Sequence, residues 1–453
     1  MDSSILIALN FLTTRRLIVV LTVAIILVFM PNNSSLASPL FQSVRTNEYQ
    51  VSHSDGQLTP NASAFIRVPQ DTASLQQAIA QVSNGGIIEL ANGTYSAPAP
   101  EGFELKNIGK SFTIQAAAGA TVVLSGNNAN PIISFLNTDI SAGGLVTFKG
   151  LTFANGRYNA DGRAGGISMY KARARFIDCR FENNLGNQPS TGGGGILVVD
   201  GSTASFSNCV WERNYAKNEG GGMAVNSNAT VTIYNSQFVG NRTNLPGHRL
   251  TSGGGAIHVG NASLTVYDTI FEGNEAGYVG GAVFVIGNWT NPVSTPRSQV
   301  NIVRSTFLNN QVLPDPAVVL NFPTEGGAFH AEDQTTAQIM DSVFTGNKAN
   351  TGGAVNLYRA IVSINTSVFK ENKATGIGAA NGFGAAISVI SNDANDATTA
   401  GGTINRRSAS LSIIDTFIQG IANQTVGQAG GGLYVTGENK KIAVPNGLSE
   451  KRK

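Results

Sequence analysis

The residues best suited to bind a ligand recur at one register of a repeated sequence. Each repeat contains a glycine phrase, such as Gly254-Gly-Ala-Ile257 or Gly280-Gly-Ala-Val283, followed by a short run in which apolar residues alternate. Alternation with a period of two places every second side chain on the outer face of a strand. The outward positions of these runs hold imidazole, aromatic, amide and carboxylate groups: His258, Phe284, His330, Asn356, Glu332 and Tyr358.

Stacked repeats would bring these six side chains together. In-register stacking spaces the first four along a line in steps of about 4.8 Å and sets the last two beside it. Aromatic rings combined with amide and imidazole groups suit sugar rings. We therefore predict a ligand-binding groove for a polysaccharide or cell-surface glycan on an exposed strand face; the alternative is a partly exposed surface beneath packed loops. The longest insertions adjoin these repeats and would flank the groove: 242–252, 287–299, 311–325 and 391–408.

Two cysteines occupy equivalent positions of adjacent repeats, Cys179 and Cys209. The Cα atoms of in-register neighbours lie about 4.8 Å apart, within disulfide range, but their Cβ atoms are slightly too far apart for an unstrained bridge. Serine or threonine fills this position in other repeats, which favours a requirement for a small side chain. A disulfide and a pair of buried free thiols both stay open.

The repeats themselves share an aromatic residue followed by asparagine three positions later. Full copies end at Phe307/Asn310, Phe344/Asn347 and Phe369/Asn372 among others, and degenerate copies occur at Phe153 and Phe417. The asparagines would stack as a structural ladder at one bend, because asparagine tolerates the left-handed backbone and can bond to the next repeat. The asparagines expected in this ladder are Asn184, Asn214, Asn241, Asn274, Asn310, Asn347 and Asn372.

The spacing of the repeats predicts the fold. Phe344 and Phe369 lie 25 positions apart, and the apolar residues before each aromatic alternate with a period of two. Three short strands in one such repeat cannot enclose a core alone, but stacked repeats pair their backbones and share one core. A β-propeller blade needs about 40–50 residues, and helical solenoids need apolar spacings of three and four. We predict an all-β chain that forms a single right-handed parallel β-helix, a solenoid of stacked coils.

The predicted domains run from an export signal to a polar tail. Arg15 and Arg16 precede an apolar run, Leu17–Met30, so we expect residues 1–37 to be a signal peptide, or else an uncleaved N-terminal anchor. Residues 38–63 are expected to be a disordered tether, 64–437 the β-helix and 438–453 a polar basic tail. The spacing Ser74-Leu-Gln-Gln77 predicts the start of a helix that caps the first coil. The chain is thus expected to be secreted or at the cell surface, meeting a membrane only through an uncleaved N-terminal segment.

Composition narrows the classes of partner. Lysine plus arginine number 30 and aspartate plus glutamate 28, so the net charge of +2 provides no strong field for nucleic acid, and we expect none as a partner. Two cysteines exclude a disulfide framework and a four-cysteine zinc site.

Two family resemblances follow from these motifs. The repeated GGA-[I/V] and F-x-x-N phrases, over about residues 150–436, resemble the repeats of chlamydial polymorphic outer-membrane proteins. The segment Leu75–Tyr95 is similar to the N-terminal coil of pectin-lyase-like right-handed β-helix proteins. The first resemblance implies an adhesin-like surface module, although those proteins end in a membrane β-barrel for which no room follows residue 437.

Enzymatic activity is the competing hypothesis. Lyases of the pectin-lyase-like class imply calcium-binding acids with an Arg or Lys base, and hydrolases imply paired carboxylates. The ligand-binding face offers only Glu332 with the adjacent Asp333, and Asp200 several coils away. The sequence shows no Asp-rich calcium loop, zinc-ligand spacing, Ser-His-Asp set or phosphate loop. We therefore predict a binding module with no catalytic residue, metal or cofactor; a polysaccharide lyase or epimerase is the alternative, and a purely structural rod the third.

Overall fold

The computed structural model describes most of the chain from residue 63 onward, within the compact unit Pro60–Lys453. The predicted signal segment, nearly all of the tether, most of the four insertions and the end of the tail lie outside the described residues. The described ranges are 63–141, 143–159, 162–187, 192–243, 253–287, 298–313, 323–333, 335–376, 382–390, 409–418, 432–436 and 441–443.

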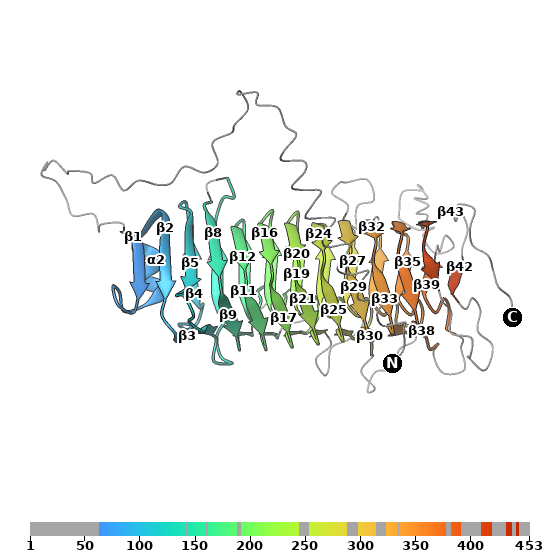
Figure 1. Cartoon of the computed structure of the whole chain (residues 1–453), viewed down its shortest axis with the longest axis horizontal. Coiled ribbons are helices and arrows are strands. Elements are labelled where there is room, and N and C mark those ends of the chain that lie inside the picture. Colours follow the sequence, from blue (N-terminus) through green and yellow to red (C-terminus); the bar gives the residue numbers. More distant parts are fainter. Residues whose placement is uncertain are drawn as a thin grey trace, which may run out of the picture. The chain divides into compact units, whose positions relative to one another are not determined.

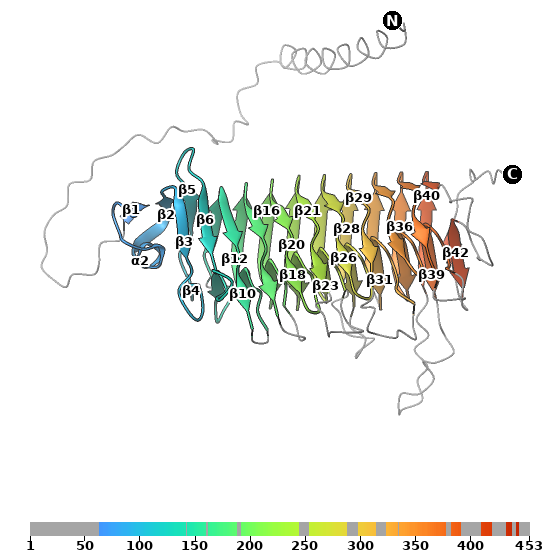
Figure 2. The same cartoon turned by 90° about the horizontal axis from the view of Figure 1, so that it is seen from below.

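The described chain winds into a stack of coils whose strands pair in parallel with those of the coils before and after (Figure 1). One coil runs through β12 (Arg173–Ile177), β13 (Arg180–Glu182), β14 (Leu185–Gly186) and β15 (Ile196–Val199). Each of these strands belongs to a different sheet, here called A, B, D and C in chain order. The architecture is the predicted parallel β-helix (Figure 2), but with four strands in a full coil rather than the three expected.

Sheet A carries the first strand of each coil. Its inward residues alternate with outward ones, as in β12, where Ala174 and Phe176 are buried. The strand β43 continues this sheet beyond residue 437, where the sequence indicated a tail. With β12, sheet A contains β1 (Ser63–Val68), β2 (Val82–Leu90), β5 (Phe112–Ala116), β8 (Leu145–Lys149), β16 (Thr203–Ser207), β20 (Thr230–Tyr234), β24 (Ser263–Tyr267), β28 (Gln299–Val303), β32 (Thr336–Met340), β36 (Ile361–Asn365), β40 (Ser410–Ile414) and β43 (Lys441–Ala443).

Sheet B carries the aromatic residue of each repeat. The bend that separates it from sheet A has a residue with a positive φ, such as Asp178 (54°) or Asp268 (50°). With β13, sheet B contains β3 (Gly93–Ser96), β6 (Val122–Ser125), β9 (Leu151–Ala154), β17 (Val210–Glu212), β21 (Gln237–Val239), β25 (Ile270–Glu272), β29 (Thr306–Leu308), β33 (Val343–Thr345), β37 (Val368–Lys370) and β41 (Phe417–Ile418).

Sheet D is the sheet that the sequence did not reveal, because its strands have only two residues and show no alternation. It follows the ladder asparagine of each repeat. With β14, sheet D contains β10 (Arg157–Tyr158), β18 (Tyr215–Ala216), β22 (Arg242–Thr243), β26 (Glu275–Ala276), β30 (Gln311–Val312), β34 (Lys348–Ala349) and β38 (Lys373–Ala374).

Sheet C follows the glycine phrases and completes the coil. Its inward residues, such as Ile196 and Val198, lie in the core as expected. With β15, sheet C contains β4 (Phe103–Lys106), β7 (Ile133–Leu136), β11 (Ile167–Tyr170), β19 (Met223–Asn226), β23 (Ile257–Gly260), β27 (Val283–Ile286), β31 (Phe329–Glu332), β35 (Val355–Tyr358), β39 (Ile387–Ile390) and β42 (Leu433–Thr436).

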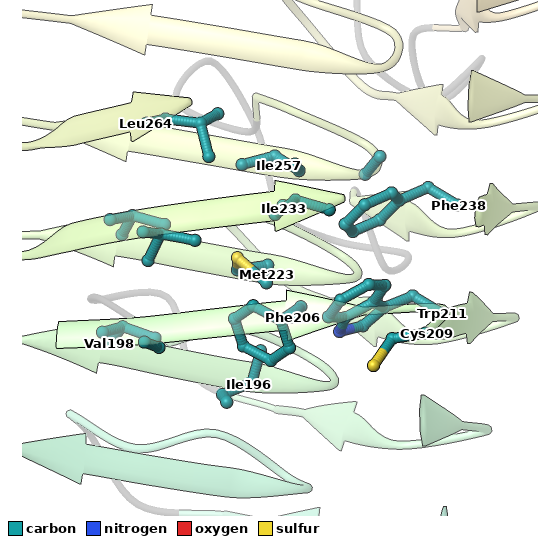
Figure 3. Close-up of a cluster of buried hydrophobic side chains, with 14 of the residues drawn as sticks. Ile196, Val198, Phe206, Cys209, Trp211, Met223, Ile233, Phe238, Ile257 and Leu264 are labelled. Atoms are coloured by element: carbon teal, nitrogen blue, oxygen red, sulfur yellow. The ribbon is translucent and has the colours of Figure 1, made fainter. Parts of the chain in front are cut away.

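A continuous column of aromatic rings fills the core beside sheet B. The rings of Trp211 and Phe238 stack with centroids 4.3 Å apart, and both point into the same interior in Figure 3. Phe271 and Phe307 continue the column at 4.6 Å. The degenerate repeat at Phe417 departs from this pattern, because Ile418 pairs with Phe369 and Phe417 points outward with 56% of its surface exposed.

The predicted asparagine ladder forms a second buried column. In each full repeat except the last, that of Asn372, the amide Nδ2 donates to the Oδ1 of the asparagine in the next coil, as from Asn241 to Asn274 at 3.0 Å. The same Nδ2 donates to a backbone carbonyl of the preceding coil, that of Trp211 in this case, at 2.9 Å. The left-handed residue at this bend is the one before the asparagine, such as Asn183 or Arg213. The ladder asparagines are therefore kept for their hydrogen bonds, and their neighbours make the turn.

The two cysteines are free thiols buried in a third column. Elsewhere in this column a hydroxyl such as Ser236 Oγ donates to Tyr234 O at 2.7 Å and accepts from the backbone N–H of Cys209 at 3.1 Å. Burial, and secondarily the neighbouring Cys209, raise the pKa of the Cys179 thiol. The position selects a small side chain, as the sequence suggested.

The helix α2 (Leu75–Gln81) forms where the capping spacing predicted it. Ser74 Oγ accepts a hydrogen bond from the backbone N–H of Gln77 at 3.2 Å. Leu75, Ala78 and Ile79 are buried against the beginning of the β-helix core.

Candidate functional site

The structure places the six predicted binding residues in register on sheet C. His258 pairs with Phe284, Phe284 with His330, and His330 with Asn356 on successive strands. Glu332 and Tyr358 form the parallel row two positions on. The side chains are therefore aligned along the stack as the repeat predicted.

The expectation that this face is exposed was wrong for the first row. His258 is 5% exposed, Phe284 6%, His330 1% and Asn356 0%. Only Glu332 and Tyr358, in the second row, are half-buried. The first row therefore forms a floor rather than a surface.

The cover over this floor is the chain segment between sheets D and C. Residues immediately before or within the glycine phrases pair with one another from coil to coil: Glu219, Gly253, Val279, Glu325 and Thr351. This segment lies against the floor, since a Cβ placed on Gly253 would be 2.3 Å from Cδ1 of Phe284. A Cβ on Gly255 would be 2.3 Å from the carbonyl oxygen of Gly281 in the next coil. The glycine phrases thus permit close packing of the covering segments, in addition to making turns.

A cavity of about 510 Å³ opens between this cover and the second row of sheet C. Three of the predicted residues line it, His258, Phe284 and Glu332, whereas His330, Asn356 and Tyr358 are not part of its lining. The described residues that line it are Asn218, Glu219, Asn226, Ser227, His258, Gly260, Asn261, Tyr278, Val279, Phe284, Ile286, Gly287 and Glu332.

The cavity also contains residues that the sequence did not single out. Glu219 and Tyr278 come from the covering segments, and Asn226 and Asn261 from the ends of strands or the turns after them. The sequence contains a signal for Glu219 and Tyr278, because each stands one or two positions before a glycine phrase. This signal identifies cavity residues only once it is known that these positions fold back over sheet C.

Several buried polar atoms of the lining lack a hydrogen-bond partner within the described residues. They are Asn218 Oδ1, Asn226 Oδ1, Asn261 Oδ1 and His258 Nδ1. Asn226 is anchored through its other amide atom, with Nδ2 donating to Glu219 Oε2 at 2.8 Å. Its Oδ1 faces the space left by Gly260, where a Cβ would come within 2.7 Å. Unpaired buried polar atoms are unfavourable unless a ligand or water satisfies them.

The chemistry of His258 follows from its burial. Burial lowers the pKa of His258, and the negative charge of Glu219 opposes this only in part. The imidazole is therefore neutral near pH 7 and offers one donor and one acceptor.

A carboxylate network lies next to the cavity, centred on His330. His330 Nε2 is 3.4 Å from Glu332 Oε2, and its Nδ1 is 3.7 Å from Glu325 Oε2. Asn356 Nδ2 lies 2.9 Å from Glu325 Oε2 and 3.2 Å from His330 Nδ1. Because this amide nitrogen only donates, His330 Nδ1 accepts, and the proton sits on Nε2, facing Glu332.

The two carboxyl groups of this network differ in their pKa. Burial raises the pKa of Glu325, although His330 opposes the rise. Burial also acts to raise the pKa of Glu332, but the hydrogen bond and the electrostatic influence of His330, together with the positive charge of Arg359, outweigh it and leave the pKa lowered. Glu325 therefore holds its proton to higher pH than Glu332 does.

Tyr278 and Arg359 complete the surroundings. Burial, together with Glu325, Glu332 and Tyr358, raises the pKa of Tyr278 to about 12, so its hydroxyl stays protonated. Arg359 Nη2 pairs with Asp333 Oδ1 at 2.8 Å, and its guanidinium lies 4.3 Å from the ring centroid of Tyr358.

Within the ranges given above, no group of three or more His, Cys, Asp or Glu side chains is placed to hold a metal ion. No helix in that part of the chain is both long and apolar enough to cross a membrane.

Comparison with protein families identifies the fold. The family model described as a right-handed β-helix region matches residues 101–275 and 165–360, which together span more than half of the chain. The chain belongs to this right-handed β-helix family. Together with the strand order, the match confirms the predicted fold class, including its hand. Among curated protein sequences, none matches the chain.

Solved structures with some similarity include carbohydrate-active enzymes. Pectate lyase Pel9A is 14% identical, with 84% of this chain and 79% of that chain covered and a TM-score of 0.34. The catalytic domain of a GH87 α-1,3-glucanase in complex with nigerose is 11% identical, with coverage of 86% and 70% and a TM-score of 0.33. A mannuronic acid specific polysaccharide family 6 lyase from human gut microbiota is 11% identical, with coverage of 77% and 86% and a TM-score of 0.29. These scores are too low to carry an argument about this chain, whose fold rests on its strand pairing and family match.

Proposed function

We propose that this β-helix is an exported binding module that recognises a carbohydrate in the cavity between sheet C and its cover. The observation that carries the proposal is the cavity of about 510 Å³, which combines the aromatic residues Phe284 and Tyr278 with unpaired buried amide oxygens. Aromatic rings stack on the apolar faces of sugars, and sugar hydroxyls donate to such oxygens. The repeats resembling those of chlamydial polymorphic outer-membrane proteins support a role at the cell surface.

The location of the site differs from the sequence-based hypothesis. A ligand would touch His258, Phe284 and Glu332 among the six predicted residues, and would meet Glu219, Asn226 and Tyr278 in addition. The remaining three, His330, Asn356 and Tyr358, would not touch the ligand and would instead help to position Glu332.

Binding can be tested with two substitutions that alter the cavity from opposite sides. Tyr278→Ala removes an aromatic ring, and Gly260→Ala places a methyl group 2.7 Å from Asn226 Oδ1, which a small movement of that amide relieves. On an oligosaccharide array, each variant should lose at least tenfold in affinity for the sugars that the wild type binds. Tyr234→Ala is the matched control, since Tyr234 is 45% exposed on the outer face of sheet A. An array without any bound sugar, or undiminished binding by both variants, would refute the proposal.

A second candidate is hydrolysis of a glycosidic bond by Glu325 and Glu332. The specific observation is the pair of carboxyl groups on either side of His330, with the pKa of Glu325 raised by burial and that of Glu332 lowered. Such a difference suits a general acid beside an ionised carboxylate. New reducing ends from a polysaccharide, lost in Glu325→Gln, would favour this candidate. Calcium-dependent release of unsaturated oligosaccharides from uronic-acid polymers would instead favour a lyase.

A further inference from the structure

The cavity is rich in acceptors and negative charge. Its described lining has two ionisable carboxyl groups, on Glu219 and Glu332, and neither lysine nor arginine occurs among those residues. Arg359, whose positive charge acts on Glu332, is outside the lining and is engaged with Asp333 and Tyr358. An anionic ligand would therefore meet repulsion, and a cationic one attraction.

Two polar side chains, each more than nine-tenths buried, favour a ligand that carries hydrogen-bond donors, independently of the carboxylates. Asn226 is 9% exposed, and its Oδ1 accepts no hydrogen bond in the part of the chain that the structure describes. His258 is 5% exposed, and its Nδ1 is likewise unpaired there. Both face Gly260, where a Cβ would lie 2.7 Å from Asn226 Oδ1 and 3.2 Å from His258 Nε2. Asn226 Oδ1 thus lies directly beside Gly260 and is an unpaired acceptor that a donor on a ligand would satisfy.

The aromatic residues of the lining favour the same class of ligand. Phe284 and Tyr278 present π systems that attract an ammonium group, and carboxylates nearby strengthen the attraction. The pKa of Glu332 is lowered, because the hydrogen bond and the electrostatic influence of His330, together with the positive charge of Arg359, outweigh burial, so this carboxylate is ionised across the physiological range.

We propose that the cavity selects glycans with free amino groups, with the ammonium held near Glu219 and Glu332 and the sugar ring against Phe284 or Tyr278. This inference rests on the proposed carbohydrate-binding function and specifies its ligand class. Ammonium and hydroxyl donors supply what the unpaired oxygens lack. N-acetylation would remove the positive charge, and a uronate would replace it by a negative one.

The test compares three oligosaccharides of equal length on the full chain by titration calorimetry near pH 6. The probes are a glucosamine tetramer, its fully N-acetylated counterpart and a galacturonate tetramer. We expect the glucosamine tetramer to bind at least tenfold more tightly than the N-acetylated one, and the galacturonate tetramer not to bind. Glu219→Gln and Glu332→Gln should each reduce the preference for the free amine at least threefold. Tyr278→Ala should weaken binding of both neutral and cationic sugars.

The control is Glu272→Gln, which removes a carboxylate of the exposed outer face of sheet B and should leave the preference unchanged. Far-ultraviolet circular dichroism verifies that each variant is folded. Equal binding of the free and acetylated tetramers, reduced by Tyr278→Ala, would overturn the amine selectivity while leaving the carbohydrate function in place. Failure of all sugars to bind, on these probes and on the array, would overturn both.

Discussion

At the scale of single residues, the polar groups of this protein are divided between a core column and the cavity. The ladder asparagines are fully or almost fully buried, and each satisfies its amide through the neighbouring coils. The cavity residues Asn226 and His258 are slightly more exposed, at 9% and 5%, and each keeps an unpaired atom. The contrast separates asparagines whose amides are satisfied within the fold from those with an unpaired oxygen, which the proposed function assigns to a ligand.

The ladder can be tested at Asn274, which lies in the middle of the column. Its Nδ2 donates to Asn310 Oδ1 at 2.9 Å and to the backbone carbonyl of Phe238 at 2.9 Å. Asn274→Ala should lower the free energy of unfolding by about 3 kcal/mol, because it leaves several buried groups unpaired. Denaturant unfolding measures this, and Asn301→Ala, at an exposed position of β28, should change stability by less than about 0.5 kcal/mol. Equal effects of the two substitutions would contradict a role for the ladder in stability.

His258 predicts a pH dependence of stability. Its pKa is lowered in the folded chain by burial, so below the ordinary value of about 6.5 the unfolded chain binds the extra proton more readily. Stability should therefore fall as pH decreases through and below about 6.5, until the folded-state pKa is reached. The loss between about pH 7.5 and 5 should be smaller in His258→Gln than in the wild type. An equal loss of free energy of unfolding in the two proteins between these pH values would contradict this role of His258.

At the scale of elements, the covering segments and the column of aromatic rings should tolerate different substitutions. The covers pack backbone against backbone through glycine, whereas the rings pack side chain against side chain. Phe307 is fully buried, and its ring lies 4.6 Å from that of Phe271 and 4.5 Å from that of Phe344.

Removing one ring should open a cavity in the column. Phe307→Ala should reduce the free energy of unfolding by about 3–5 kcal/mol, and Phe307→Leu by less, since leucine fills part of the space. Phe417→Ala serves as the control, because Phe417 is 56% exposed, and its effect should stay within about 0.5 kcal/mol. Thermal or denaturant unfolding provides the comparison; a loss at Phe417 equal to that at Phe307 would count against the stacked core.

The sequence predicted those elements whose residues alternate. Sheets A, B and C, the capping helix and the asparagine ladder follow from periodicity and from recurrence at a fixed register. Sheet D did not follow, because a strand of two residues such as Leu185–Gly186 has no period. The cover over sheet C was also missed, although apolar outward residues such as Leu197 and Val199 were a sign that this face is buried.

The candidate site was predicted only in part for the same reason. His258, Phe284 and Glu332 were found because they share a register, whereas Glu219 and Tyr278 reach the cavity through the path of the covering segment. That path depends on backbone contacts between glycines of successive coils, which single-sequence patterns do not specify.

At the scale of the whole molecule, the fold is a sum of coils that contact their neighbours. Ile339 of β32 pairs with Ile364 of β36, so these residues mark the same point of two successive coils. Removing one full period at this point should leave every remaining residue in register.

A pair of deletions tests this modularity. Deleting residues 340–364 joins Ile339 to Asn365 and preserves alternation, so the shortened chain should fold with the β-sheet circular dichroism of the parent. Deleting residues 340–363 joins Ile339 to Ile364 and reverses the faces of the strand that follows. The second variant should be less soluble and unfold at markedly lower temperature. Identical behaviour of both deletions would show that register does not govern this solenoid.

The direction of the bonds between coils has a mechanical consequence. Backbone bonds such as Thr306 N–H to Thr269 O and the side-chain bonds of the ladder join each coil to its neighbours along the direction of stacking. Tension applied between the two ends therefore pulls on these contacts one layer at a time, and the outermost layer has a partner on one side only. Under load such a molecule should therefore unfold in discrete steps from its ends, one coil at a time, so a brief pull unfolds the outermost coils and leaves the remaining coils folded.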